Sequence, residues 1–143
     1  MIEECNERGN KKIFVAKEKS KTFVIQNTSK VYINKVRVDN CYIKDDGKKC
    51  DYLFEIMDKN KIIYVELKGN KLEDAIKQLE TTIYHRKIKE LHKKFIKECY
   101  IIVSKVKRTR AKDASKSSNV KFEFKRKHNI SLFVSTNKKE III

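Results

Sequence analysis

The chain has 143 residues, a length that suits one domain with a substantial hydrophobic core and excludes two domains of ordinary size. It carries 35 Lys or Arg against 19 Asp or Glu, a formal net charge of +16, while 40% of its residues are hydrophobic. So large a positive excess predicts a polyanionic partner, with nucleic acid favoured over an anionic membrane surface. Wholesale disorder is excluded by the apolar content, and no apolar run approaches the roughly 18 residues of a membrane span.

The N-terminus and the cysteines predict an intracellular location. Residues 1–5 are acidic where a secretory leader needs a basic and then an apolar stretch, so we expect the protein in the cytoplasm. The cysteines stand at positions 5, 41, 50 and 99, without CxxC pairs or a matching histidine spacing, which argues against a structural zinc site. We therefore expect reduced thiols, with Cys41, Cys50 and Cys99 as small core residues.

The first half of the chain has mostly strand-like patterns. Residues 1–10 predict a short helix or a loose arm. Runs rich in β-branched and aromatic residues then predict strands at 13–15, 22–25 and 31–38, the last as one strand or two. Residues 50–57 and 62–68 flank a four-residue turn and predict an antiparallel hairpin.

The second half begins with helical spacing. Apolar residues recur three or four positions apart, which predicts one long helix over 71–97, or two helices with a break near 84–87. An unbroken apolar run predicts a buried strand at 99–104. The aperiodic residues 105–119 predict an exposed basic loop or a poorly ordered helix. Two final strands are expected at 120–124 and 130–134.

Two carboxylates and a lysine are expected at one end of the hairpin. Because the chain turns near residue 59 or 60, the residue opposite Asp51 should lie near 67–69, close to Glu66 and Lys68. Glu66 and Lys68 are two positions apart and point to the same face, whereas Leu67 faces the core. The two carboxylates and the Leu67 backbone carbonyl are hard oxygen ligands for Mg²⁺, and the ammonium group can orient an attacking water.

These residues carry a resemblance to a known family. Cys50-Asp51, then Glu66-Leu67-Lys68 followed by a glycine and an amphipathic helix, resembles the PD-(D/E)XK nuclease superfamily over roughly residues 50–104. Cys50 replaces the proline of the family's name, a change that the superfamily tolerates. Gln78 stands where several branches carry a glutamine on that helix, but the tyrosine expected four residues later is Thr82, with Tyr84 nearby.

The resemblance implies a fold, an activity and a set of roles. The fold would be α/β (α+β), with a central mixed sheet, a restriction-endonuclease-like αβββαβ core, one long helix after the ExK strand and additional N-terminal strands, all in a single domain over 1–143. The activity would be metal-dependent hydrolysis of phosphodiester bonds, with Mg²⁺ or Mn²⁺ as cofactor. Asp51, Glu66 and the Leu67 carbonyl would hold the metal, Lys68 would be catalytic and Gln78 would lie beside the site.

A further acidic ligand is common in the family. The candidates are Glu3, Glu4, Glu7 and Asp39, with Asp45 or Asp46 as substitutes. Structural interpretations stand beside the catalytic ones. Glu66 and Lys68 could form a same-face ion pair, Asp51 could cap its strand, and Gln78 could be a solvent-facing polar residue. His85 and His92 lie among basic residues and are interpreted as surface or phosphate-contacting side chains rather than metal ligands.

The basic residues are concentrated near the C-terminus. Residues 105–127 hold ten Lys or Arg against Asp113 and Glu123, which is half of the whole chain's excess. Phosphate contacts are favoured over a solvated charged surface. DNA is favoured over RNA, and the expected enzyme is a restriction-like or structure-selective endonuclease, with a homodimer as the expected arrangement. The alternatives are an inert nucleic-acid-binding module with a nuclease-like fold and an RNA-cleaving, toxin-type nuclease. The predicted nucleic-acid contacts are Lys105, Lys107, Arg108, Arg110, Lys112, Arg86 and Lys87.

Overall fold

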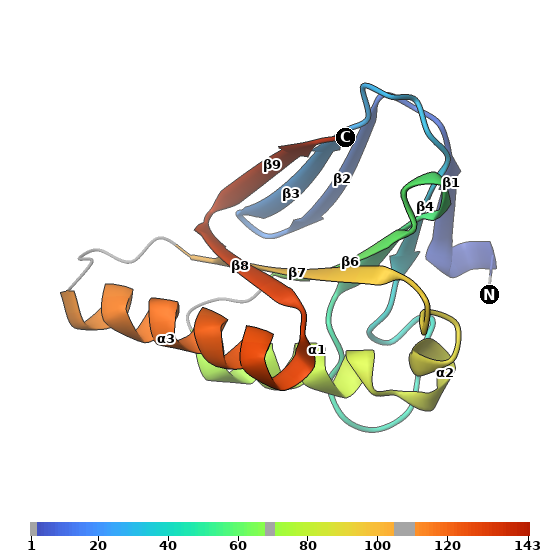
Figure 1. Cartoon of the computed structure of the whole chain (residues 1–143). Helices are drawn as coiled ribbons and strands as arrows, with labels where there is room; N and C mark the ends of the chain where they lie inside the picture. The colour runs from blue at the N-terminus through green and yellow to red at the C-terminus, as the bar shows by residue number, and fades with distance from the viewer. Residues whose placement is uncertain (1–2, 68–70, 105–110) are drawn as a thin grey trace.

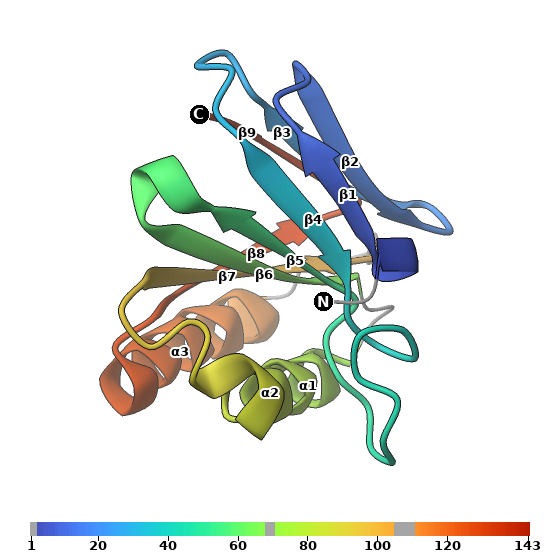
Figure 2. The same ribbon diagram turned by 90° about the vertical axis from the view of Figure 1, so that its right-hand side faces the viewer.

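The computed structural model describes residues 3–67, 71–104 and 111–143, with only the backbone described at residues 3 and 111–118. The described residues form three layers (Figure 1): a six-stranded sheet in the middle, three helices on one of its faces and a three-stranded sheet on the other. The six-stranded sheet twists so that β1 and β4 lie close to the three-stranded sheet (Figure 2). The predicted mixed α/β architecture with a central mixed sheet and additional N-terminal strands is therefore confirmed.

The six-stranded sheet runs in the order β1-β4-β5-β6-β7-β8. Neighbouring strands from β1 to β6 are antiparallel, whereas β6, β7 and β8 are parallel. Its strands are β1 (Asn6–Gly9), β4 (Ile33–Arg37), β5 (Tyr52–Ile56), β6 (Lys61–Leu67), β7 (Ile96–Val103) and β8 (Ser131–Thr136). The three-stranded sheet has the order β2-β3-β9, with β2 (Ile13–Glu18), β3 (Lys21–Gln26) and β9 (Lys138–Ile142).

Burial on both faces explains the nearly continuous apolar sequence of β6. Ile62 and Tyr64 pack in the core between the sheet and the helices. Ile63, Val65 and Leu67 pack in a second core between the two sheets. A strand that alternates between two buried faces needs apolar residues at every position, as central strands of layered α/β proteins do. After Lys61 at the start of the strand, Glu66 is the one charged residue of β6, and it is only 1% exposed.

The helical segment after β6 is broken, as one of the two predicted arrangements required. Helix α1 (Leu72–Ile83) ends before Tyr84, and α2 (Arg86–Lys89) begins after His85. The His85 ring accepts a hydrogen bond from the backbone N–H of Lys87 (3.1 Å), which caps the second helix. Among the described residues, no helix is long and apolar enough to cross a bilayer.

The predicted strand at 120–124 is wrong, because these residues lie in helix α3 (Ala111–His128). The alternation of Val120, Phe122 and Phe124 with charged residues is typical of a strand. However, Val120 and Phe124 are also four residues apart, so they share one helical face and pack against the helix-side core. Phe122 then points away and is 68% exposed. The same helix covers residues 111–119, where the sequence predicted either an exposed basic loop or a poorly ordered helix.

Two short strands had no counterpart in the sequence analysis. Strand β1 replaces the expected helix or arm and pairs with β4, while β9 pairs in parallel with β3. The chain crosses from β8 to β9 at Asn137, whose φ of 63° asparagine tolerates better than most residues. The Asn137 N–H donates to Val103 O (2.8 Å), and its carbonyl accepts from Thr22 N–H (2.9 Å). One residue thus joins the ends of the two sheets.

His92 is buried, contrary to the prediction of a surface residue. Its ring Nδ1 lies 3.0 Å from the Tyr64 hydroxyl and its Nε2 lies 2.9 Å from Glu55 Oε2. The other oxygen of Glu55 accepts from Asn34 Nδ2 (2.7 Å). This chain of hydrogen bonds satisfies polar groups that would otherwise be costly inside the fold. His92 therefore fixes the loop after α2 against the sheet.

The expectation of reduced thiols is wrong for one pair of cysteines. Cys5 and Cys41 form a disulfide that joins the short 3-10 turn η1 (Glu3–Cys5) to the turn after β4, with their Cα atoms 5.7 Å apart. Cys50 and Cys99 are free and buried, as predicted for core residues. The bond closes a loop across a sequence separation of 36 residues.

Replacing both Cys5 and Cys41 by serine should lower the free energy of unfolding by about 3 to 4 kcal/mol, because the unfolded chain regains the entropy of that loop. Denaturant unfolding with and without a reductant measures the effect. Reductant should destabilise the wild type and leave the double variant unchanged. Equal stability of the oxidised and reduced wild type would contradict the disulfide.

Candidate functional site

Asp51 and Glu66 meet at the open end of the β5–β6 hairpin. The strand register pairs Tyr52 with Val65, so the next residues outward are Asp51 and Glu66, one position nearer than the predicted 67–69. The Asp51 N–H donates to Glu66 Oε1 (3.2 Å), and Asp51 Oδ2 accepts from Leu67 N–H (2.8 Å). Each carboxylate is therefore held by the backbone of the opposite strand. Asp51 does cap the strand end, and the same contacts bring the two acids together.

Helix α1 fixes the residues that lead into Asp51. The Cys50 N–H donates to Thr82 Oγ1 (2.8 Å), and Gln78 Nε2 donates to the Lys49 carbonyl (3.1 Å). Thr82 also donates to the Gln78 carbonyl (2.8 Å). Thr82 thus anchors the entry to strand β5. Gln78 is 8% exposed, so its interpretation as a solvent-facing residue is wrong.

Lys49 is a buried cation that shapes the loop before the site. Its ammonium group is 2.7 Å from an Asp45 carboxylate oxygen and donates to the carbonyls of Asp46 (3.2 Å) and Gly47 (2.6 Å). Its backbone N–H donates to Asp39 (3.2 Å), and Asp45 in turn contacts the His85 ring (2.6 Å). Burial of such a charge is tolerated because these partners satisfy it. The loop is therefore held between the hairpin and the start of α2.

A third carboxylate approaches from the other sheet. Glu18, the last residue of β2, raises the pKa of Asp51 through its negative charge. Asn137, where the chain crosses from β8 to β9, bonds to Thr22 on one side and to Val103 on the other. These bonds hold the tip of the β2–β3 hairpin, which carries Glu18, at the end of β7. Glu18 belongs to another sheet and lies far from Asp51 in sequence, so no local motif could have identified it.

The site makes ionisation of Asp51 difficult. Burial raises the pKa of Asp51 most, and the negative charge of Glu18 adds to it, while hydrogen bonds from Leu67 N–H and with Glu66 oppose the shift. The resulting pKa is about 6. A carboxylate with a raised pKa beside other acids favours a proton or a cation at this place.

The donor set fits a hard divalent cation. Asp51 and Glu66 supply carboxylate oxygens, and Gln78 carries a buried Oε1 that has no hydrogen-bond partner among the described residues. Carboxylate and amide oxygens are ligands that Mg²⁺ and Mn²⁺ accept. In the part of the chain that the structure describes, no three His, Cys, Asp or Glu side chains form a ready-made metal cluster. Any ion held here would complete its coordination with other oxygens.

The other predicted acids are engaged elsewhere. Glu7 is paired with Lys11, Asp39 with the Lys49 backbone, and Asp45 with Lys49 and His85. Glu4 and Asp46 are exposed. Among the described acids, Glu18 raises the pKa of Asp51 through its charge, whereas Glu66 lowers it through a hydrogen bond.

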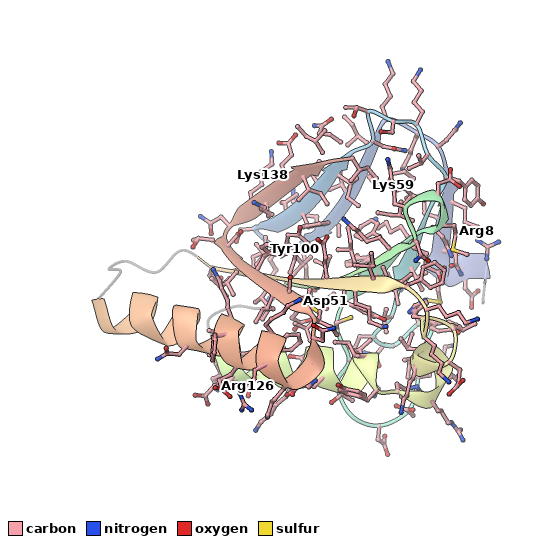
Figure 3. All side chains as sticks on the ribbon, viewed as in Figure 1. Arg8, Asp51, Lys59, Tyr100, Arg126 and Lys138 are labelled. Carbon is pink, nitrogen blue, oxygen red and sulfur yellow. A yellow bond between two sulfur atoms is a disulfide. The ribbon has the colours of Figure 1, made fainter. Side chains whose placement is uncertain are left out.

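Several predicted site residues lie outside the described residues. These include Lys68 and four of the predicted nucleic-acid contacts, Lys105, Lys107, Arg108 and Arg110. Lys112 is in α3, where the side chain is not described. Arg86 and Lys87 are exposed on α2, close in sequence to His85. Figure 3 shows Asp51 inside the outline of the molecule and Arg126 on the outer side of α3.

The free cysteines do not offer a nucleophile. Burial raises the pKa of the Cys50 thiol well above its ordinary value, and the nearby Glu66 and Asp51 add to the shift. Burial likewise raises the pKa of Cys99. Both thiols therefore stay protonated at neutral pH.

Comparisons with protein-family models, with curated proteins and with solved structures gave no match.

The raised pKa of Asp51 predicts how the free energy of unfolding depends on pH. Ionisation is harder in the fold than in the unfolded chain, so stability falls as pH rises from about 4 through 6. Asp51→Asn removes this charge and should raise the free energy of unfolding at pH 8 by up to about 3 kcal/mol, with the gain vanishing toward pH 4. Denaturant unfolding across this pH range measures it.

The matched control is Asp58→Asn, which changes an exposed carboxylate in the hairpin turn η2 (Met57–Lys59). We expect no pH-dependent gain from that change. A loss of stability in Asp51→Asn at pH 8 would mean that Asp51 serves only as a strand cap.

Proposed function

We propose that the protein is a metal-dependent nuclease that hydrolyses phosphodiester bonds, with DNA as the favoured substrate. The observation that carries the proposal is the desolvated pair of Asp51 and Glu66, held together at the end of the hairpin with Asp51 at a pKa of about 6. A divalent cation bound at this site would offset the cost of ionising the buried carboxylates. The net charge of +16 supports a polyanionic substrate independently.

The strand order supports the same proposal. An antiparallel meander, β4-β5-β6, is followed by helices and a parallel strand, β7. This is the order of strands expected of the PD-(D/E)XK core. A 3-10 turn at Glu3–Cys5 and strand β1 stand where that core usually begins with a helix. The proposed assignment therefore rests on the hairpin, the helix after it and the next strand.

Each residue of the site has a proposed role. Asp51 and Glu66 would hold the cation, with the Leu67 carbonyl and the unpartnered Gln78 oxygen as further donors. The bound Mg²⁺ would supply Lewis acidity at the scissile phosphate. Lys68, placed by the sequence two residues after Glu66, would orient the attacking water. Glu18 would tune the affinity of the pair for the cation through its effect on Asp51.

Glu66→Gln should abolish cutting of supercoiled plasmid in Mg²⁺ or Mn²⁺ while retaining binding of DNA in EDTA, because the amide cannot replace a charged ligand. The control is Glu140→Gln, which changes an exposed carboxylate of β9 that accepts from Gln26. That variant should cut like the wild type. If Glu66→Gln still cuts at the wild-type rate, the site assignment is wrong. Binding without cutting by the wild type on plasmid, single-stranded DNA and structured RNA would favour the inert binding module.

Glu18→Gln should shift the acidic limb of the pH–rate profile to lower pH, since it removes a negative charge that raises the pKa of Asp51. It should also weaken Mn²⁺ binding about tenfold, as changes beside metal ligands do. Titration calorimetry and the pH–rate profile measure the two effects. An unchanged profile would show that Glu18 does not act on the reacting group.

A further inference from the structure

A lysine-lined pocket lies at the opposite end of the parallel strands from the carboxylates. It has a volume of about 600 Å³ and lies where the starts of β7 and β8 meet α2 and the end of α3. We define the lysine pocket by its four ammonium side chains, Lys89, Lys93, Lys97 and Lys125. Glu66 pairs with Ile101 of β7, and the nearest lining residue on that strand is Glu98, so three residues, or about 10 Å of strand, separate the two places.

The charge of this pocket is not compensated within it. Among the described residues, no carboxylate lies within 4 Å of any of the four ammonium groups. The one lining acid, Glu98, contacts Lys61 (3.5 Å), which is not a pocket residue. The lining His128 is bound by Tyr84 (2.6 Å) and Glu80 (2.8 Å). The pocket therefore presents positive charge to whatever enters it.

Partial burial adds to this attraction for an anion. Burial lowers the pKa of Lys97, and its ammonium group donates to the Phe95 carbonyl (3.3 Å), a neutral partner. A cation that has lost part of its hydration without gaining a negative partner binds an incoming anion more strongly than an exposed lysine does. The pocket lining also includes the apolar side chains of Ile83, Phe95 and Ile130. A ligand that fits has both an anionic and an apolar part.

We propose that the lysine pocket binds one nucleotide, with the phosphate on Lys93, Lys97 and Lys125 and the base against the apolar lining residues. This inference rests on the proposed function, because it assigns the nucleotide to a nucleic acid substrate. The volume suits a small ligand of this size. The same chemistry is offered by a free nucleotide and by a nucleotide within a strand, and the experiment separates the two.

The first test measures binding alone. Fluorescence anisotropy of a labelled 12-nucleotide single-stranded DNA, in EDTA and over a range of salt concentrations, compares the wild type with Lys93→Ala/Lys125→Ala. Both lysines are exposed, so the fold should be unaffected. The variant should lose about tenfold in affinity at low salt, and the magnitude of its log–log salt slope should fall by about 0.7, because both lysines contact the same phosphate.

The control is Lys12→Ala/Lys138→Ala, which removes the same charge from exposed lysines outside the pocket. It should stay within twofold of the wild type. If both double variants lose the same affinity, the loss comes from the change in net charge, and the proposed pocket is overturned. A wild type that binds no oligonucleotide would overturn the nucleic-acid partner itself. A pocket variant equal to the wild type would overturn only the pocket.

The second test identifies the ligand class. Titration with AMP, followed by amide NMR shifts, should move Phe95–Glu98 and Asn129–Ser131 saturably, and inorganic phosphate should move them only at about tenfold higher concentration, because the base adds apolar contact. Equal affinities for AMP and phosphate would overturn the base contact. If the oligonucleotide shifts these amide signals and AMP does not, the ligand is a nucleotide within a strand. If AMP saturates the shifts at a lower concentration than the oligonucleotide does, the ligand is a free nucleotide.

Discussion

The reciprocal hydrogen bonds between Asp51 and the Glu66–Leu67 segment fix the open end of the β5–β6 hairpin. Each acid accepts a backbone N–H from the opposite strand, so the register of the hairpin and the position of both carboxylates are set by the same contacts. A slip of one residue would separate the acids and would also turn the apolar residues of β6 to the wrong faces. The two buried cores of β6 therefore stabilise the geometry of the site as well as the fold.

Desolvation of this pair depends on all three layers. The helix layer holds the strand entry through Thr82 and Gln78, and the three-stranded sheet brings Glu18 from the opposite side. Concentrating negative charge there is unfavourable, even in a chain that is strongly basic overall. By contrast, each of the three histidines contacts a carboxylate, whereas no described carboxylate lies within 4 Å of a pocket lysine's ammonium group. The molecule thus separates an acidic centre from a basic surface.

Local sequence patterns predicted the helices and strands whose formation depends on neighbouring residues in the chain. The hairpin turn, the helix break before α2 and strand β8 follow from turn residues and from the spacing of apolar residues. The segment Val120–Phe124 could not be assigned in this way, since its spacing satisfies both a strand and a helix and only packing against the helix-side core decides. Strand β9 is rich in lysine and forms because β3 offers a parallel partner.

Some residues of the candidate site could be predicted from local sequence, and others could not. Asp51, Glu66 and Gln78 were identified from spacing and resemblance, because one hairpin and the next helix bring them together. Glu18 and the disulfide of Cys5 with Cys41 depend on contacts between segments distant in sequence. The burial of His92 depends on how the loop after α2, which carries it, packs against the sheet, and hydropathy does not reveal this.

The most direct test of the metal centre is the location of Mn²⁺ in crystals by anomalous scattering. We expect a single strong peak within bonding distance of an Asp51 oxygen and a Glu66 oxygen at pH 7.5, and no such peak in crystals grown at pH 4.5, where Asp51 is protonated. A well-ordered Asp51–Glu66 pair with no ion at pH 7.5, under millimolar Mn²⁺, would contradict the account.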